Sequence, residues 1–118
     1  MVGPTHPLEP SADQMRSMVD QAADRVIHHI ASLQGQPASY DEHAPNLRAS
    51  VGALAESLPE CGSDLEGLLD LLFHEVIPIS YNTAGPGYLA YIPGGGVFPS
   101  AVADFIANAV NRYVGVWI

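Results

Sequence analysis

The last third of the chain is nearly free of charge, and this limits what the chain can fold into. Residues 76–118 hold one acid, Asp104, and one base, Arg112, while 25 of these 43 residues are apolar. The formal net charge of −9 therefore lies entirely before Val76. Apolar surface of this extent is stable only when it is removed from water. We expect residues 77–118 to pack on protein outside this chain, which would make the chain incomplete as a folding unit.

The start of the chain predicts a short arm followed by a long helix. Residues 1–10 contain three prolines and predict an extended arm, because proline fixes its own φ and disfavours helix in the residue before it. Ser11 and Gln14 then fit a capping box, and apolar residues recur at helical spacing up to Gly35. This helix is the first element of a helical N-terminal segment that we predict over residues 11–76.

Two further helices are predicted in the same segment. A weaker helical pattern covers residues 46–58 and ends at Pro59. Ser63 and Glu66 fit a second capping box, which is followed by leucines at helical spacing until Pro78. The fold class is therefore predicted to be mainly α.

A last helix is predicted over residues 100–114, and it is apolar around most of its circumference. Its polar residues share one stripe at i, i+4, i+7 and i+8: Asp104, Asn108, Asn111 and Arg112. Such a helix is usually buried, and the stripe would then form a polar network across an interface. The alternative is a local bridged pair of Asp104 and Arg112. We expect a structural role for the stripe.

Composition excludes several classes of partner and chemistry. The net charge of −9 argues against binding to nucleic acid or to anionic membranes. The chain contains no lysine, so it can supply neither a Walker lysine nor a lysine that attaches a cofactor covalently. Its one cysteine, Cys61, allows no internal disulfide, and no apolar run approaches the roughly 20 residues of a membrane helix. We expect a cytoplasmic protein.

The histidines do not predict a metal site. His74 and Glu75 begin a motif like that of zinc proteases, but the position one turn later is Pro78 and not a second histidine. His28 and His29 are adjacent on a predicted helix, so their side chains point about 100° apart. We expect both to be solvated, and we expect no metal.

The glycine-rich segment before the last helix is the most unusual part of the sequence. Gly94, Gly95 and Gly96 could present backbone N–H groups to an anion at a helix N-terminus, or they could form a close-packed turn. Their spacing fits neither a P-loop nor a dinucleotide-binding motif, which favours the turn. Tyr91 and Pro93 add rigid surface of a kind that is common in the walls of small-molecule pockets.

The longest motif in the chain resembles a known enzyme family. The run from His74 to Gly96 reads HEVIPISYNTAGPGYLAYIPGGG, and it is followed by ADF at 103–105 and NRYVGVW at 111–117. This pattern is similar to the N-terminal region of the pyridoxal phosphate-dependent group II decarboxylases, which include the aromatic-amino-acid, tyrosine and glutamate decarboxylases. The resemblance extends from about Met15 to Trp117.

The resemblance implies a fold-type I enzyme in which pyridoxal phosphate is bound mainly by a longer C-terminal domain or large subunit. That part supplies the Schiff-base lysine, so no catalytic residue is assigned to this chain. The family's N-terminal helices wrap around the other subunit of a homodimer. By similarity, four residues line the substrate pocket: Tyr91, Ile92, Pro93 and Gly94. Four others lie at the dimer interface, near the partner's active site: Tyr113, Gly115, Val116 and Trp117.

The function implied is decarboxylation of an amino acid by the complete enzyme, with this chain as its N-terminal fragment or small subunit. The chain would provide a wall of the substrate pocket and part of the dimer interface, and it would be inactive alone. The alternative is a non-catalytic helical interaction module, or a truncated homologue, that binds a full-length relative. No residue here distinguishes decarboxylation from aldehyde formation or identifies the amino acid.

Overall fold

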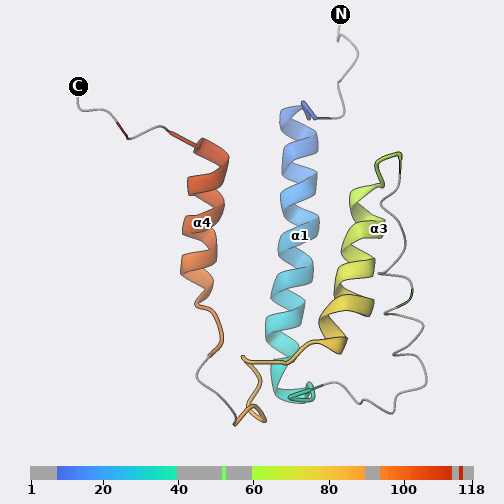
Figure 1. Ribbon diagram of the computed structural model, residues 1–118. Helices are drawn as coiled ribbons and strands as arrows, with labels where there is room; N and C mark the ends of the chain where they lie inside the picture. The colour runs from blue at the N-terminus through green and yellow to red at the C-terminus, as the bar shows by residue number, and fades with distance from the viewer. Residues whose placement is uncertain (1–7, 40–51, 53–59, 90–93, 113–114, 116–118) are drawn as a thin grey trace, which may run out of the picture.

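The computed structural model describes residues 8–39, 52, 60–89, 94–112 and 115 (Figure 1). Within these ranges the elements are all helical and no strand occurs, as the sequence predicts. None of the described helices is long and apolar enough to cross a membrane.

The first helix, α1, spans Ala12–Ser32 and continues as the 3₁₀ turn η1 over Leu33–Gly35. The predicted capping box is present. Ser11 Oγ accepts a hydrogen bond from the Gln14 backbone N–H at 3.3 Å, and Gln14 Oε1 accepts one from the Ser11 N–H at 2.8 Å. These bonds satisfy N–H groups that the first turn of a helix leaves free. The prediction of this helix is confirmed.

The second helical region consists of three consecutive parts. α3 spans Leu65–Asp70, η2 is a π-helical stretch over Leu71–Val76, and η3 is a 3₁₀ turn over Ile77–Ile79. Pro78 lies in η3, where its missing N–H and its ring oppose continuation of the helix. The predicted helix thus forms, but its last two turns are not α-helical.

The start of α3 corrects the sequence-based interpretation. Ser63 and Glu66 do not form the predicted capping box, because the helix begins one residue later than that box requires. Asp64 is the cap, and its Oδ1 accepts a hydrogen bond from the Gly67 N–H at 2.8 Å. The predicted helix over residues 46–58 lies outside the described residues except for Gly52, which is helical.

The last helix, α4, spans Phe98–Val110, so the predicted range of 100–114 is wrong at both ends. Pro99 lies in its first turn, where a missing N–H costs no hydrogen bond. The helix ends at Asn111, whose left-handed backbone (φ 41°) turns the chain out of the helix. Arg112 therefore lies beyond the helix and cannot extend a stripe along it.

The described α-helices lie side by side, with α1 between α3 and α4 (Figure 1). α3 runs parallel to α1, and α4 runs antiparallel to it.

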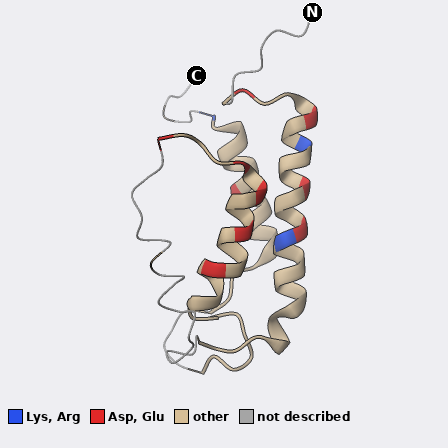
Figure 2. Ribbon diagram, turned by 90° about the vertical axis from the view of Figure 1, so that its right-hand side faces the viewer, with Lys and Arg blue, Asp and Glu red and all other residues tan. Residues whose placement is uncertain are grey.

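An ion pair joins α1 to the end of α3. Arg25 Nη1 lies 2.6 Å from Asp70 Oδ1. This oxygen accepts no hydrogen bond of good geometry from any described residue. Both side chains are partly exposed, so this ion pair contributes at most about 1 kcal/mol. Figure 2 shows that charged residues gather on α1 and α3.

The described residues bury little apolar surface. Leu69 of α3 is the one apolar side chain among them that is buried, and all of α4 is exposed. The chain exposes 10326 Å², whereas a compact protein of its 12.5 kDa mass exposes about 6,200 Å². Its radius of gyration is 18.2 Å, against about 13.5 Å for a compact domain of this length. The helices therefore do not enclose a core of their own.

This surface leads to a prediction for the isolated 118-residue chain. It should show helical circular dichroism, bind an apolar dye strongly and melt gradually, because its exposed apolar faces provide no cooperative core. Thermal melting followed by circular dichroism, together with dye fluorescence, measures this. A sharp transition without dye binding, for a species that sediments as a monomer, would contradict it.

Candidate functional site

The loop of residues 80–88 docks on the C-terminal end of α1 (Figure 1). The Asn82 backbone N–H donates a hydrogen bond to the Ala38 carbonyl at 2.9 Å. On its other side the loop approaches the same residue, since a Cβ added to Gly87 would lie 3.4 Å from the Ala38 methyl carbon. Three backbone hydrogen bonds of 3.1 Å lie within the loop. The Thr83 N–H donates to the Tyr81 carbonyl, the Gly85 N–H to the Asn82 carbonyl and the Tyr88 N–H to the Gly85 carbonyl.

A cluster of partly buried polar groups lies where the loop meets α1. Gln36 Nε2 donates to Ser32 Oγ at 2.8 Å and to the His29 carbonyl at 3.2 Å, and it lies 3.3 Å from His29 Nδ1. Gln36 Oε1 faces the loop and lies 3.5 Å from Asn82 Nδ2. Ser32 Oγ in turn donates to the His29 carbonyl at 2.9 Å. One glutamine side chain thus contacts both the end of α1 and the loop.

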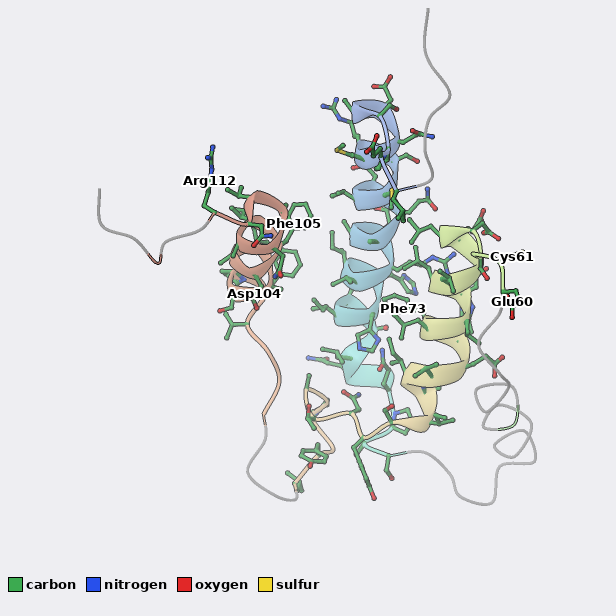
Figure 3. All side chains as sticks on the ribbon, turned by 45° about the horizontal axis from the view of Figure 1, so that its top comes forward. Glu60, Cys61, Phe73, Asp104, Phe105 and Arg112 are labelled. Atoms are coloured by element: carbon green, nitrogen blue, oxygen red, sulfur yellow. The ribbon has the colours of Figure 1, made fainter. Side chains whose placement is uncertain are left out.

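His29 corrects the expectation that both adjacent histidines are solvated. His28 is exposed, but His29 is half-buried, and its ring packs edge-on against Phe73 with 6.1 Å between centroids. Phe73 belongs to η2 and points into the space between α1 and the α3–η2 segment (Figure 3). Adjacent positions on α1 therefore have different environments because only one of them faces η2.

A cavity of about 440 Å³ opens between the end of α1, the η2–η3 segment and the loop. Its wall includes the rings of His29, Phe73 and Tyr81. The side-chain amides of Gln36 and Asn82 and the hydroxyl of Thr83 also line it. Small-molecule sites commonly combine apolar surface with a few oriented polar groups, as this wall does. Sequence reasoning missed the cavity, because nothing in the run from His74 to Gly96 indicates that it meets His29 and Gln36 of a distant segment.

The predicted pocket residues are only partly within the described chain. Tyr91, Ile92 and Pro93 lie outside the described residues, and Gly94 is exposed. The neighbouring Gly95 is packed closely, since an added Cβ would lie 2.7 Å from the Ala84 Cβ and 3.0 Å from its Cα. Gly94 and Gly96 have nothing within 4 Å of an added Cβ. Of the three glycines, Gly95 is therefore the one that is closely packed.

The predicted polar stripe on the last helix is exposed. Asp104 and Asn108 lie on α4, and Asn108 Nδ2 donates to the Asp104 backbone carbonyl at 2.8 Å. Arg112 points away from the helix (Figure 3), and among the described residues no ion pair joins it to Asp104. A structural role for these residues at an interface stays a prediction.

Most of the predicted interface residues near the C-terminal end also lie outside the residues that the structure describes. Gly115 is exposed, whereas Tyr113, Val116 and Trp117 lie outside the described residues. No group of three or more potential metal ligands occurs in the described part of the chain.

An apolar groove of about 470 Å³ separates α1 from α4. Its lining is almost wholly aliphatic and aromatic, including Met18, Val19, Val26, Leu65, Phe98 and Phe105. Phe105 lies on the side of α4 that faces α1 (Figure 3). A wall without polar groups provides no chemistry, so the groove is a packing surface and the loop with its cavity is the better candidate site.

Comparison with known proteins adds one informative match. The chain is similar to a decarboxylase. It is 36% identical over 111 residues to an aromatic-L-amino-acid decarboxylase of Bacillus atrophaeus. The match covers 94% of this chain and 22% of that protein, so the chain spans about a fifth of the length of this curated relative. No protein-family model matches the chain, and no solved structure matches it.

The glycine segment provides a prediction with its own control. In the natural protein that carries this sequence, Gly95→Ala should lower the free energy of unfolding by about 1–3 kcal/mol, because the new methyl group overlaps Ala84. Gly94→Ala should leave it unchanged or raise it by up to about 1 kcal/mol, because the site is open and alanine restricts the unfolded chain. Denaturant unfolding of both variants measures the difference. Equal effects would show that Gly95 is not packed on Ala84.

Proposed function

We propose that this chain is part of a pyridoxal phosphate-dependent amino acid decarboxylase. The observation that carries the proposal is the 36% identity to a decarboxylase over 94% of the chain. Because the match spans only 22% of that relative, the complete activity would require further protein beyond this segment. The exposed apolar faces of α1 and α4 support the same proposal, since they need cover that the described residues do not provide.

The residues of this chain fit a supporting role around the cofactor. When bound, the cofactor would supply an acceptor for the electron pair that remains on Cα as carbon dioxide leaves. A chain without lysine has no side-chain amine that could attach this cofactor as an imine, so its attachment would belong to the C-terminal domain or large subunit. This chain would position and enclose the substrate, and Tyr91, Ile92, Pro93 and Gly94 would line the pocket beside the substrate side chain.

A homodimer of the complete enzyme belongs to the same proposal. The groove between α1 and α4 is apolar and would be covered by the rest of the enzyme. Tyr113, Gly115, Val116 and Trp117 would lie at the dimer interface near the partner's active site. Asp104, Asn108 and Arg112 would make polar contacts there. We also propose that the enzyme acts in the cytoplasm.

The proposal predicts that the natural protein carrying this sequence releases carbon dioxide from an amino acid. The assay supplies pyridoxal phosphate and measures carbon dioxide and amine from each aromatic L-amino acid first, and then from the other proteinogenic amino acids. Protein stripped of the cofactor is the control and should be inactive until pyridoxal phosphate is restored.

Two other results would overturn the proposal. Formation of an aldehyde with oxygen consumption would indicate oxidative chemistry on the same cofactor. No turnover of any amino acid, together with isolation in a complex with a full-length relative, would indicate a non-catalytic interaction module.

The pocket assignment predicts the effect of changing Tyr91. Tyr91→Ala should raise the KM of an aromatic substrate by an amount equivalent to about 1–3 kcal/mol, because an aromatic wall is lost. Tyr91→Phe is the matched control and should retain most of the affinity, because it keeps the ring. The cofactor absorbance should be the same in both variants. A changed cofactor spectrum with an unaltered ranking of substrates would place Tyr91 in the scaffold and not in the pocket.

A further inference from the structure

We propose that Gln36 is the positioning residue that fixes the loop of residues 80–88 on the end of α1 and, through the loop, sets the place of the glycine segment that bears Gly94. Gln36 does not touch the reacting atoms in this account. Its effect on the reaction rests on the proposed function, whereas its hold on the loop does not.

The contacts of Gln36 with α1 are the strong part of this arrangement. Its Nε2 group donates to Ser32 Oγ at 2.8 Å and to the His29 carbonyl at 3.2 Å. Both acceptors belong to the last turn and a half of α1, where carbonyl groups lack partners within the helix. Gln36 therefore caps the end of α1 with its side chain and at the same time holds its own backbone close to that end.

The hold on the backbone matters because the same segment presents the acceptor for the loop. Ala38 is two residues after Gln36, and its carbonyl receives the Asn82 N–H at 2.9 Å. The direct contact between Gln36 Oε1 and Asn82 Nδ2 is 3.5 Å, which is long for a hydrogen bond and makes only a weak contribution. Gln36 thus acts mainly by keeping the Ala38 carbonyl where the loop can bind it.

The loop continues this connection to the glycine segment. Gly85 and Asn82 are so close that a Cβ added at Gly85 would lie 2.5 Å from Asn82 Nδ2. Ala84 lies between them, and Gly95 packs against it. A Cβ added to Gly95 would lie 3.0 Å from the Ala84 Cα. The path from α1 to Gly94 is therefore a continuous series of contacts. The coupling along this path is what the experiment measures.

Gln34 provides a matched control within the same turn. It is a glutamine in η1, it is exposed, and it makes no side-chain hydrogen bond to another described residue. Gln34→Ala and Gln36→Ala remove the same atoms two residues apart. A general effect of shortening a glutamine at the end of α1 would appear in both variants. Loss of the positioning role would appear only in Gln36→Ala.

The experiment uses the natural protein that carries this sequence and has two readouts. Hydrogen exchange measures protection of the Asn82 amide, and steady-state kinetics with the preferred amino acid separate KM from kcat. Gln36→Ala should speed exchange at the Asn82 amide by about tenfold and raise KM by about tenfold. It should change kcat by less than about twofold. A tenfold change corresponds to the loss of about one hydrogen bond. Gln34→Ala should change neither readout.

Two further variants separate hydrogen bonding from side-chain volume. Gln36→Glu keeps the length and the Oε1 acceptor but loses the Nε2 donor, so it should behave like Gln36→Ala. Ser32→Ala removes one acceptor of Gln36, and its effect should be smaller than that of Gln36→Ala and should vanish when Gln36 is already alanine. Behaviour of Gln36→Glu like the unmodified protein would show that volume alone matters and would overturn the proposal.

The remaining outcomes also decide the proposal. Unchanged exchange at Asn82 in Gln36→Ala would overturn it, and so would faster exchange with an unchanged KM, because the loop would then not set the substrate wall. If the natural protein decarboxylates no amino acid, the proposed function fails. The exchange measurement alone then decides whether Gln36 holds the loop.

Discussion

Apolar helix faces have to be removed from water, and the described helices of this chain do not do this for each other. α1 carries half-exposed apolar side chains along its length, such as Met15 and Ile27, and α4 exposes Phe105, Ile106 and Val110. The groove between the two helices is apolar on both sides. An interface with the remainder of a larger enzyme would cover such surfaces. The proposed place of the chain in a decarboxylase follows from this requirement and from the match to a decarboxylase.

Polar contacts have a different role from the apolar faces. Where the loop of residues 80–88 meets α1, hydrogen bonds and close backbone approaches define one arrangement, because each of them depends on direction or on the absence of a Cβ. Ala38 makes both a hydrogen bond and a close approach: its carbonyl accepts from the Asn82 N–H, and its methyl group faces Gly87. Apolar burial would hold this segment in the complete protein, while these contacts would decide where the candidate pocket wall lies.

Local sequence patterns predicted the elements that depend on local chemistry. The capping box at Ser11 and the helical spacing after it were sufficient for α1. The capping-box pattern placed the cap at Ser63. The adjacent Asp64 can also cap a helix, and Asp64 is the cap. The end of α4 was misplaced because the left-handed conformation of Asn111 depends on one backbone torsion that apolar spacing does not report.

The candidate site was beyond such patterns because it depends on contacts between distant residues. Gln36 and Asn82 are separated by 46 positions. Asn82 lies in the run from His74 to Gly96, but nothing in that run indicates that it meets Gln36. His29 looked like a surface residue beside His28 because the amphipathic pattern does not show that Phe73 covers only one of them. The assignment of Tyr91 and its neighbours to a substrate pocket stays a prediction. The glycine motif that follows did not show that Gly95 is the glycine packed on Ala84.

The most direct test of the account is to locate the cofactor in the natural protein that carries this sequence. The protein is loaded with pyridoxal phosphate, reduced with borohydride and digested, and the modified peptide is identified by mass spectrometry. We predict one stable phosphopyridoxyl group on a lysine outside these 118 residues, because the chain itself contains no lysine. A stable adduct within residues 11–118, or a protein that retains no pyridoxal phosphate, would contradict the assignment of this chain to a pyridoxal phosphate-dependent decarboxylase.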